Sequence, residues 1–340
     1  QRLTASSGIK LIDFKNFNNN SFHVTAELTA KNGDEEFRPD FTIIIKGMPL
    51  AFVEDKKPHN KEGVLAERSR INSRLKNKHF RRFANITQLM VFSNNMEYED
   101  GIVEPVCGVF YATAAYAELH FNYFREDEDF PVKQKLDTVS ELEENALLKD
   151  NNLLVIKHSP EFKVNKVPQT PTHRILTSLF SKERLAFILR YAITYVEEES
   201  GLQKHIMRYP QLFATKAIAS KLDDNKRKGI IWHTQGSGKT ALAFFNVKHL
   251  TDYYQKKNII PKFYFIVDRI DLLIQSSAEF ANRGLKVNQV NSRQEFINDL
   301  QVVGAIHNDS GQPEITVVNI QKFSEDATVI KLPDYDINTQ

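Results

Sequence analysis

Cysteine is nearly absent from the 340-residue sequence: Cys107 is the only one, so the chain cannot form an internal disulfide. A zinc site could draw no more than one thiolate from it, and a reducing, cytoplasmic setting is expected. The sequence also lacks any uncharged apolar run near the roughly 18 residues that a membrane span requires, so no membrane partner is expected. Neither sign of charge dominates, because 45 Lys and Arg residues face 43 Asp and Glu residues. Net charge therefore gives no argument for nucleic-acid binding.

The first ten residues contain neither an initiator Met nor the charged and then apolar pattern of a signal peptide. We therefore expect a chain cut from a longer protein. At roughly 150 residues per domain, the length predicts two domains. The expected division is a first domain at 1–150 with a truncated N-terminus, a linker and entry segment at 151–175 that contains Pro168 and Pro171, and a second domain at 176–340.

Strand and helix patterns run through both predicted domains. In the first, strands are expected at 22–28, 41–45, 50–55 and 86–93, with a turn at 46–49 and helices at 64–83 and, capped by Ser140, at 141–148. In the second, strands are expected at 229–233, 262–267 and 315–318, with helices at 175–199 and 240–254. Strand, helix and strand in this order favour an α/β fold with a parallel sheet in the second domain.

The segment 234–240 reads Thr-Gln-Gly-Ser-Gly-Lys-Thr and lies between a predicted strand and a predicted helix. Glycines allow a tight turn whose backbone N–H groups point at phosphate oxygens, and the following helix N-terminus adds its dipole. Lys239 is expected to reach the β and γ phosphates of ATP, and the Thr240 hydroxyl to ligate Mg²⁺. His233 stands where the full phosphate-loop pattern has a glycine, a departure that helicase-type motors tolerate. The residues expected to contact ATP here are Gln235, Gly236, Ser237, Gly238, Lys239 and Thr240.

Upstream of this loop, Gln211 is the candidate for reading the adenine edge of ATP, as a Gln in this place does in translocating ATPases. Arg208 is expected beside it. An ordinary role at the start of a helix remains an equally good interpretation for Arg208, Tyr209 and Gln211.

Asp40, Glu54 and Lys56 form a pattern of Pro-Asp, strand, turn, strand and Glu-x-Lys. Residues two apart on a strand project from one face, so Glu54 and Lys56 point together, and Asp40 can meet them across the predicted hairpin. Two carboxylates beside a lysine form an oxygen-rich site for Mg²⁺, where the Lys can position a water and stabilise charge on a phosphodiester. The pattern predicts a hydrolytic nuclease site with Asp40 and Glu54 as metal ligands and all three residues as catalytic. Lys57 is the alternative lysine, but its parity places it on the opposite face from Glu54.

Basic residues are concentrated between residues 56 and 82, where ten of them face two acidic residues. Arg70, Arg74 and Lys78 recur every four residues and would line one helix face, the geometry expected for contacts to DNA phosphates. Arg81 extends this stretch. A solvated helix face remains the alternative interpretation.

Together these motifs closely resemble the restriction (motor) subunit of type I restriction endonucleases, over nearly the whole chain. The stretches 265–275 and 320–323 contribute to the resemblance, and 92–98 and 231–240 look specific to the family beyond what a generic helicase requires. The resemblance implies a PD-(D/E)xK nuclease domain, a mixed sheet flanked by helices, followed by the first RecA-like lobe of a superfamily 2 translocase. That lobe has a parallel sheet and a phosphate loop.

The resemblance also implies an activity: Asp40, Glu54 and Lys56 would cut DNA, with ATP and Mg²⁺ as cofactors. Arg269 and Gln275 would help to grip double-stranded DNA during ATP-driven translocation. The partners that it implies are the methyltransferase (M) and specificity (S) subunits of the same restriction system.

Two of the departures from the family pattern bear directly on function. Ile71 and Leu75 stand where a Q-x-x-x-Y motif is expected, so either Arg70 and Arg74 take over its DNA contacts or the alignment is displaced. No D-E-A-H or D-E-x-D box precedes Gln340, so this fragment alone is expected to bind nucleotide weakly and not to turn it over. Two other functions stay open: a single-chain restriction or repair nuclease-helicase, and a non-catalytic nucleotide-dependent DNA-binding module.

Overall fold

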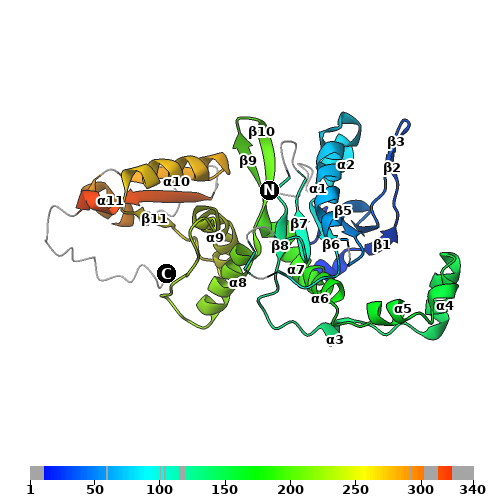
Figure 1. Cartoon of the computed structure of the whole chain (residues 1–340). Coiled ribbons are helices and arrows are strands. Elements are labelled where there is room, and N and C mark those ends of the chain that lie inside the picture. The colour runs from blue at the N-terminus through cyan, green and yellow to red at the C-terminus, as the bar shows by residue number, and fades with distance from the viewer. Residues whose placement is uncertain are drawn as a thin grey trace. The chain divides into compact units, whose positions relative to one another are not determined.

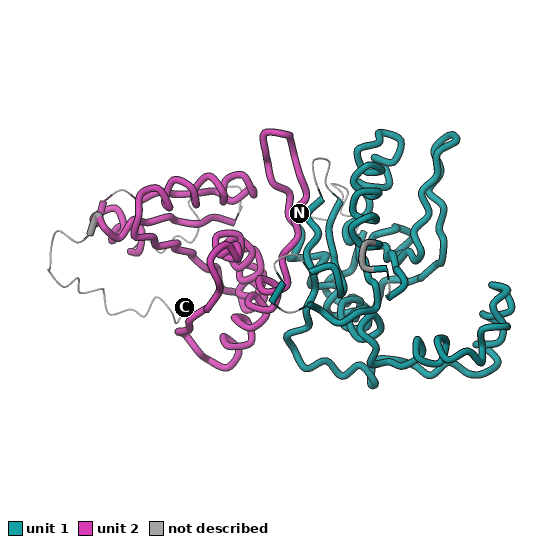
Figure 2. The backbone as a smooth tube through the Cα atoms, in the orientation of Figure 1, with its two compact units in different colours: residues 1–193 teal, residues 194–340 magenta. Residues whose placement is uncertain are grey.

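The computed structural model describes residues 11–58, 60–99, 101–102, 105–114, 119–290, 292–301 and 313–323. The chain forms two compact units, residues 1–193 and residues 194–340, which Figure 2 distinguishes by colour. Residues 151–193 therefore belong to the first unit. The role of 151–175 as a functional linker stays a prediction.

The first unit is built on a six-stranded mixed sheet with the strand order β1-β4-β5-β6-β7-β8 (Figure 1). β5 and β6 are parallel, and every other neighbouring pair is antiparallel. β6 and β7 are buried along their whole length, as expected of strands inside a sheet that is covered on both faces. The strands of this sheet are β1 (Phe22–Ala26), β4 (Phe41–Ile45), β5 (Met48–Asp55), β6 (Leu89–Ser93), β7 (Val109–Ala112) and β8 (Asn122–Phe124).

The predicted hairpin of β4 and β5 is confirmed, and it depends on its turn residues. Lys46 and Gly47 both have positive φ angles, +50° and +78°, as a tight two-residue hairpin turn requires. The hairpin pairs Phe41 with Val53. The next residues at its open end, Asp40 and Glu54, therefore lie on adjacent strand ends.

The helical region after β5 is interrupted, so the single helix predicted at 64–83 is wrong. α1 (Lys61–Lys76) ends because Asn77 adopts an extended backbone, and Asn77 Oδ1 accepts a hydrogen bond from the His79 N–H at 3.0 Å. The 3-10 turn η2 (Lys78–Phe80) and the short helix α2 (Arg81–Ile86) follow. α1 packs Ile71 and Leu75 into the hydrophobic core of the sheet.

The remaining helical segments of the first unit come after the sheet. The predicted helix at 141–148 is confirmed by α4, in which Ser140 and Glu143 form a capping box. The single helix predicted at 175–199 is wrong, because Ser181 caps a new helix and the β-branched and aromatic run that follows residue 192 favours a strand. The other elements of the unit are η1 (Phe17–Asn19), β2 (Ala30–Asn32), β3 (Glu35–Phe37), α3 (Val132–Lys135), α4 (Glu141–Asp150), η3 (Leu154–Ile156), α5 (Pro160–Asn165), α6 (Pro171–Leu179), α7 (Lys182–Phe187) and the π-helical turn η4 (Ile188–Ala192).

The second unit combines a two-stranded ribbon with a three-stranded sheet in the order β11-β13-β12. The three-stranded sheet is parallel throughout, which confirms the parallel pairing expected for the predicted strands 262–267 and 315–318. The elements are β9 (Ile193–Glu198), β10 (Gly201–Ile206), α8 (Tyr209–Asp223), α9 (Lys239–Gln255), β11 (Tyr264–Val267), α10 (Ile270–Asn282), β12 (Lys286–Val290), α11 (Arg293–Gln301), β13 (Glu314–Asn319) and η5 (Ile320–Phe323). No helix in the described part of the chain is both long and apolar enough to traverse a bilayer.

The strand predicted at 229–233 is not formed. None of the described strands pairs with this segment, and the side chains of Ile230 and Trp232 are 89% and 91% exposed. An apolar sequence makes a strand only where a neighbouring strand satisfies its backbone N–H and C=O groups. The loop that follows is therefore not held by a paired strand on its N-terminal side.

Candidate functional site

The open end of the β4–β5 hairpin gathers two carboxylates around one ammonium group. Lys56 Nζ lies 3.2 Å from Glu54 Oε2 and 3.8 Å from Asp40 Oδ2. Asp40 is fixed in turn, because its Oδ2 accepts a hydrogen bond of 2.8 Å from the backbone N–H of Asp55. The structure thus brings together the three residues that the sequence singled out, and their catalytic roles stay predictions.

A third carboxylate, Glu67 on α1, faces the same ammonium group and was missed by the sequence analysis. Glu67 is 1% exposed, and its Oε2 lies 3.4 Å from Lys56 Nζ and 2.9 Å from a terminal nitrogen of Arg70. The signal was present in the sequence: Glu67 occupies the helical spacing of Val64, Ile71 and Leu75, which are all buried. A charged residue on the apolar face of a helix is rarely buried unless it has a partner.

Burial and like charge both act on this cluster. The pKa of Glu54 is raised to about 7, first by burial and then by the carboxylates of Glu67 and Asp40, against the lowering effect of Lys56. Burial alone would lower the pKa of Lys56, but Glu54 and Glu67 outweigh burial, so the pKa of Lys56 is raised. Three carboxylates thus share one lysine, and the cluster is short of positive charge.

This shortage suits a divalent cation at Asp40 and Glu54. The described residues contain no group of three or more acidic, His or Cys side chains arranged to hold a metal ion by themselves. Mg²⁺ does not need one, because it commonly binds through one or two carboxylates and completes its shell with waters and phosphate oxygens. The residues present therefore fit Mg²⁺ together with a phosphodiester.

The glycine-rich loop of the second unit leads directly into α9. Gly236 and Gly238 have φ angles of +73° and +79°, and Gly238 is the N-cap of α9. Lys239 Nζ donates hydrogen bonds of 3.1 Å to the carbonyl oxygens of His233 and Thr234, so the loop curls around the ammonium group. The Ser237 hydroxyl is buried and has no hydrogen-bond partner among the described residues.

The other predicted nucleotide contacts lie on the same loop and helix. Gln235 is exposed, and Thr240 is half-buried in the first turn of α9. Thr240 is therefore placed where it could meet an Mg²⁺ ion that accompanies a nucleotide.

Two residues at the start of α8 hold this loop. Gln211, 3% exposed, donates from Nε2 to the carbonyl oxygen of Gly238 at 2.9 Å, and Arg208 donates from Nη2 to that of Gly236 at 2.7 Å. The Arg208 N–H in turn donates to Gln211 Oε1 at 2.9 Å. Both side chains thus contact the loop through the carbonyl oxygens of its backbone. The adenine contact of Gln211 stays a prediction.

A side chain at Gly238 would have to displace the end of the Gln211 side chain, whereas one at Gly236 would not displace a described residue. A Cβ at Gly238 would lie 2.5 Å from Gln211 Nε2, but one at Gly236 would meet nothing within 4 Å. Both positions have positive φ, so either Ala substitution is expected to cost about 1–2 kcal/mol of backbone strain. Gly238→Ala should in addition displace Gln211 and weaken ATP binding by the full-length subunit by about tenfold or more. We expect a titration with a fluorescent ATP analogue to show this extra loss, and equal affinities of the two variants would contradict it.

The basic residues predicted to contact DNA do not form one helix face. Lys78 lies in η2, beyond the end of α1, and Arg81 begins α2, so the four-residue spacing from Arg70 to Lys78 does not place them in line. Arg70 pairs with Glu67, and the guanidinium of Arg74 lies 4.7 Å from the centre of the Phe37 ring. Their contact with DNA stays a prediction.

The structure also shows where the Q-x-x-x-Y positions lie and where the two expected DNA contacts of the second unit lie. Ile71 and Leu75 are 1% and 6% exposed, so these positions cannot contact DNA as a Q-x-x-x-Y motif would. Arg269 is the N-cap of α10 and pairs with Asp271, and Gln275 is exposed on that helix. Arg269 and Gln275 therefore share the unit of the glycine-rich loop.

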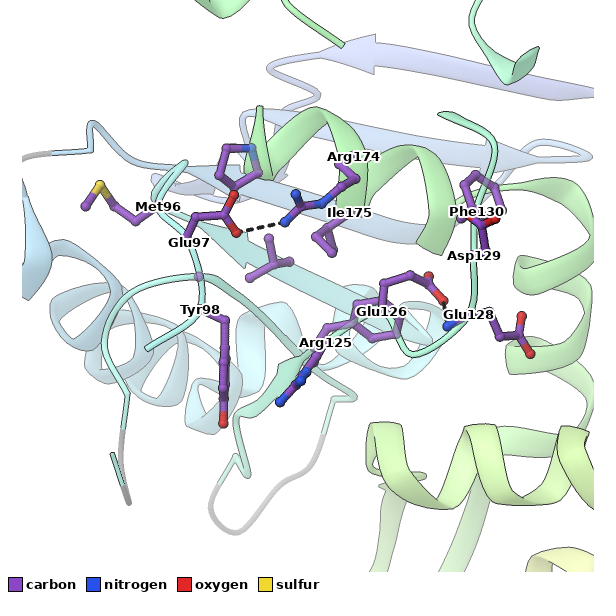
Figure 3. Close-up of a pocket in the computed structure, with 14 residues that line it drawn as sticks. Met96, Glu97, Tyr98, Arg125, Glu126, Glu128, Asp129, Phe130, Arg174 and Ile175 are labelled. Carbon is purple, nitrogen blue, oxygen red and sulfur yellow. Dashed lines mark hydrogen bonds and ion pairs between the residues drawn. The ribbon is translucent and has the colours of Figure 1, made fainter. Parts of the chain in front are cut away.

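A cavity of about 440 Å³ lies in the first unit, beside the segment that follows β6. Figure 3 shows Glu97 in its wall pairing with Arg174 of α6, at 2.8 Å. Near them, the Ser93 hydroxyl is 2.6 Å from that of Thr172, and the Thr172 N–H donates to Asn95 Oδ1 at 3.1 Å. The stretch 92–98, which carries part of the family resemblance, thus fastens α6 to the end of the sheet.

Comparison with known families gives one context for both units. Residues 3–100 match the family described as type I restriction enzyme R protein N terminus, and residues 210–338 match the family described as SWI2/SNF2 ATPase. The first region contains the carboxylates around Lys56, and the second contains the glycine-rich loop. The chain therefore matches the R-protein N-terminal family in its first region and the SWI2/SNF2 ATPase family in its second.

Similar proteins carry consistent names. The chain is 28% identical to the type I restriction enzyme MjaVIIP endonuclease subunit of Methanocaldococcus jannaschii, over 86% of this chain and 24% of the relative. It is 23% identical to the HindI endonuclease subunit of Haemophilus influenzae, over 93% and 26%, and 24% identical to the SsaAORF53P endonuclease subunit of Staphylococcus saprophyticus, over 93% and 27%. The chain thus spans about a quarter of the length of these curated relatives. Together these matches support an N-terminal fragment of the endonuclease (R) subunit of a type I restriction enzyme, because residues 3–100 match the R protein N terminus and the relatives align over most of this chain.

Proposed function

We propose that this chain is the part of a type I restriction enzyme that cuts DNA with the help of Mg²⁺. It also supplies the first lobe of the motor that uses ATP to move double-stranded DNA. The observation that carries the proposal is the convergence of Asp40, Glu54 and Lys56, with Lys56 Nζ within 3.8 Å of both carboxylates. The first unit acts as a PD-(D/E)xK nuclease and the second as a RecA-like lobe. Methyltransferase and specificity subunits are the partners, and they supply the recognition of the DNA site.

In the nuclease site, Asp40 and Glu54 hold the metal. Bound Mg²⁺ supplies a Lewis acid that offsets charge on the scissile phosphate and makes a bound water more acidic. Asp40 is pre-positioned by the Asp55 N–H, so its carboxylate does not have to be ordered when DNA arrives. Lys56 carries the positive charge of the site, and its ammonium group orients the attacking water or binds a phosphate oxygen.

In the nucleotide site, the chain's own groups bind and orient the phosphates. Gly236 and Gly238 shape the loop, the Ser237 hydroxyl is available to a phosphate oxygen, and Lys239 exchanges its two carbonyl partners for the β and γ phosphates. Thr240 ligates the accompanying Mg²⁺. Arg269 and Gln275 contact DNA beside this site.

Arg74 and Lys78 test whether the basic stretch binds DNA. In Arg74→Gln or Lys78→Gln, we expect the log-log dependence of DNA affinity on salt to flatten by about one unit for each DNA phosphate that the variant no longer neutralises. Affinity measured over a series of salt concentrations gives this slope. Lys221→Gln, a change at an exposed lysine of α8, serves as the control. Slopes equal to that of wild type would indicate that the basic stretch is a solvated surface that does not bind DNA.

The proposed function as a whole is tested with circular plasmid DNA. The full-length subunit, assembled with its methyltransferase and specificity partners, should cut the plasmid only when both ATP and Mg²⁺ are present. Cutting without the partners would instead favour a single-chain nuclease-helicase. Absence of cutting under all conditions would favour a DNA-binding module without catalysis.

A further inference from the structure

We propose that Glu67 is a positioning residue of the nuclease site, which holds the ammonium group of Lys56 from α1. The inference rests on the proposed nuclease function. Asp40 and Glu54 reach Lys56 from the two strands of the hairpin, at 3.8 and 3.2 Å, while Glu67 reaches it from the helix, at 3.4 Å. Lys56 is therefore shared among three carboxylates that come from three elements.

Glu67 does not have the surroundings of an ordinary structural carboxylate. It is 1% exposed, and neither of its oxygens accepts a hydrogen bond of good geometry from the described residues. The cations that the structure describes for it are Lys56 and Arg70. A buried carboxylate is costly unless it is paired, so the ion pair with Lys56 fixes both side chains.

The alternative, that Glu67 merely serves as a counter-ion for Arg70, does not account for its burial. The Arg70 side chain is 52% exposed, and water can solvate its guanidinium group. The Lys56 side chain is only 20% exposed, so its ammonium group depends on the carboxylates around it. Lys56, and not Arg70, is therefore the cation that depends on the charge of Glu67.

Holding Lys56 matters because its other two partners are the proposed Mg²⁺ ligands. Without the charge of Glu67, the ammonium group would pair with Asp40 and Glu54 alone. It would then compete with the cation for both carboxylates and leave the position from which it meets water or phosphate. Loss of Glu67 should therefore lower both the affinity for Mg²⁺ and the rate of cutting.

The test compares Glu67→Gln with wild type in the assembled full-length enzyme. We expect the rate of plasmid cutting to fall by about 10²-fold, with DNA affinity and ATP hydrolysis unchanged. Mg²⁺ binding to the DNA-free enzyme, measured by calorimetry, should weaken several-fold. Glu126→Gln is the matched control, because Glu126 is likewise a carboxylate paired with a largely buried cation, in its case Arg184 at 3.0 Å. It should lower the unfolding temperature without slowing the cutting per folded molecule.

A second variant, Glu67→Asp, retains the charge in case Glu67→Gln does not fold. It should cut at least about tenfold faster than Glu67→Gln, or show measurable cutting where the Gln variant is unfolded. Wild-type cutting and Mg²⁺ affinity in Glu67→Gln would overturn the proposal, and so would an Asp variant that folds but does not cut. Glu54→Ala, measured in parallel, distinguishes failure of the nuclease assignment from failure of the proposal for Glu67. If Glu54→Ala cuts normally, the nuclease site itself is wrongly assigned, whatever the result for Glu67.

Discussion

Replacing Glu54 with Ala should lower the rate of DNA cutting by the assembled enzyme by at least about 10²-fold. Lys56→Ala should have the same effect, and in both variants ATP hydrolysis should continue. Glu54 is 4% exposed and lies 3.2 Å from Lys56 Nζ, so each substitution removes one half of the central ion pair. Without Glu54 the proposed metal keeps only Asp40 as a protein ligand. Without Lys56, Asp40 and Glu54 lose their side-chain cation, and Glu67 keeps only its pair with the half-exposed Arg70 among the described residues.

The measurement is plasmid cutting and ATP hydrolysis in the same reaction. ATP hydrolysis should persist because the carboxylates lie in the first unit, whereas the glycine-rich loop lies in the second. Glu161→Ala, at an exposed glutamate of α5, is the control and should behave as wild type. If either Glu54→Ala or Lys56→Ala still cuts at the wild-type rate, the metal site lies elsewhere in the protein.

The second large effect is expected at Lys239. Lys239→Ala should abolish ATP hydrolysis and translocation by the full-length enzyme, because no other group in the loop can bring positive charge to the β and γ phosphates. Cutting that depends on translocation should disappear with it. The nuclease unit should stay folded, since the hydrogen bonds that Lys239 Nζ makes to described residues go to carbonyl oxygens of its own loop, those of His233 and Thr234.

Lys256→Ala provides the matched comparison. Lys256 follows the last residue of α9, the helix that Lys239 begins, and pairs with Asp252 at 2.9 Å, away from the loop. Its removal should leave ATP hydrolysis and movement along DNA unchanged, as measured by phosphate release and by displacement of a triplex-forming strand. Translocation by the Lys239 variant would refute the assignment of the phosphate loop.

The cutting site shows how far local sequence rules reach. Strand parity placed Glu54 and Lys56 on one face. The turn at Lys46 and Gly47 starts the pairing of the hairpin, and a register shift between Ile43 and Ile44 then brings Asp40 beside Glu54. These rules act over a few residues and need no knowledge of packing. Glu67 escaped them because its partner lies eleven residues earlier on another element, and only the docking of α1 on the sheet brings the two together.

The limited reach of local sequence rules also explains two of the wrong predictions of secondary structure. The basic residues from Arg70 to Lys78 keep a helical spacing, yet the extended backbone of Asn77 ends the helix before Lys78. The segment 229–233 has the composition of a strand, but a strand depends on hydrogen bonds to a neighbour that sequence composition does not reveal.

By itself, then, the sequence determined the α/β class, the β4–β5 hairpin, the loop that leads into α9 and the carboxylate–lysine motif, because each depends on residues close together in the chain. The tertiary structure alone decided which side chains surround Lys56, how Arg208 and Gln211 fasten the loop, and why Ile71 and Leu75 are unavailable to DNA. These are contacts between elements, and they exist only once apolar faces have been buried against one another and the polar groups beside them have found partners.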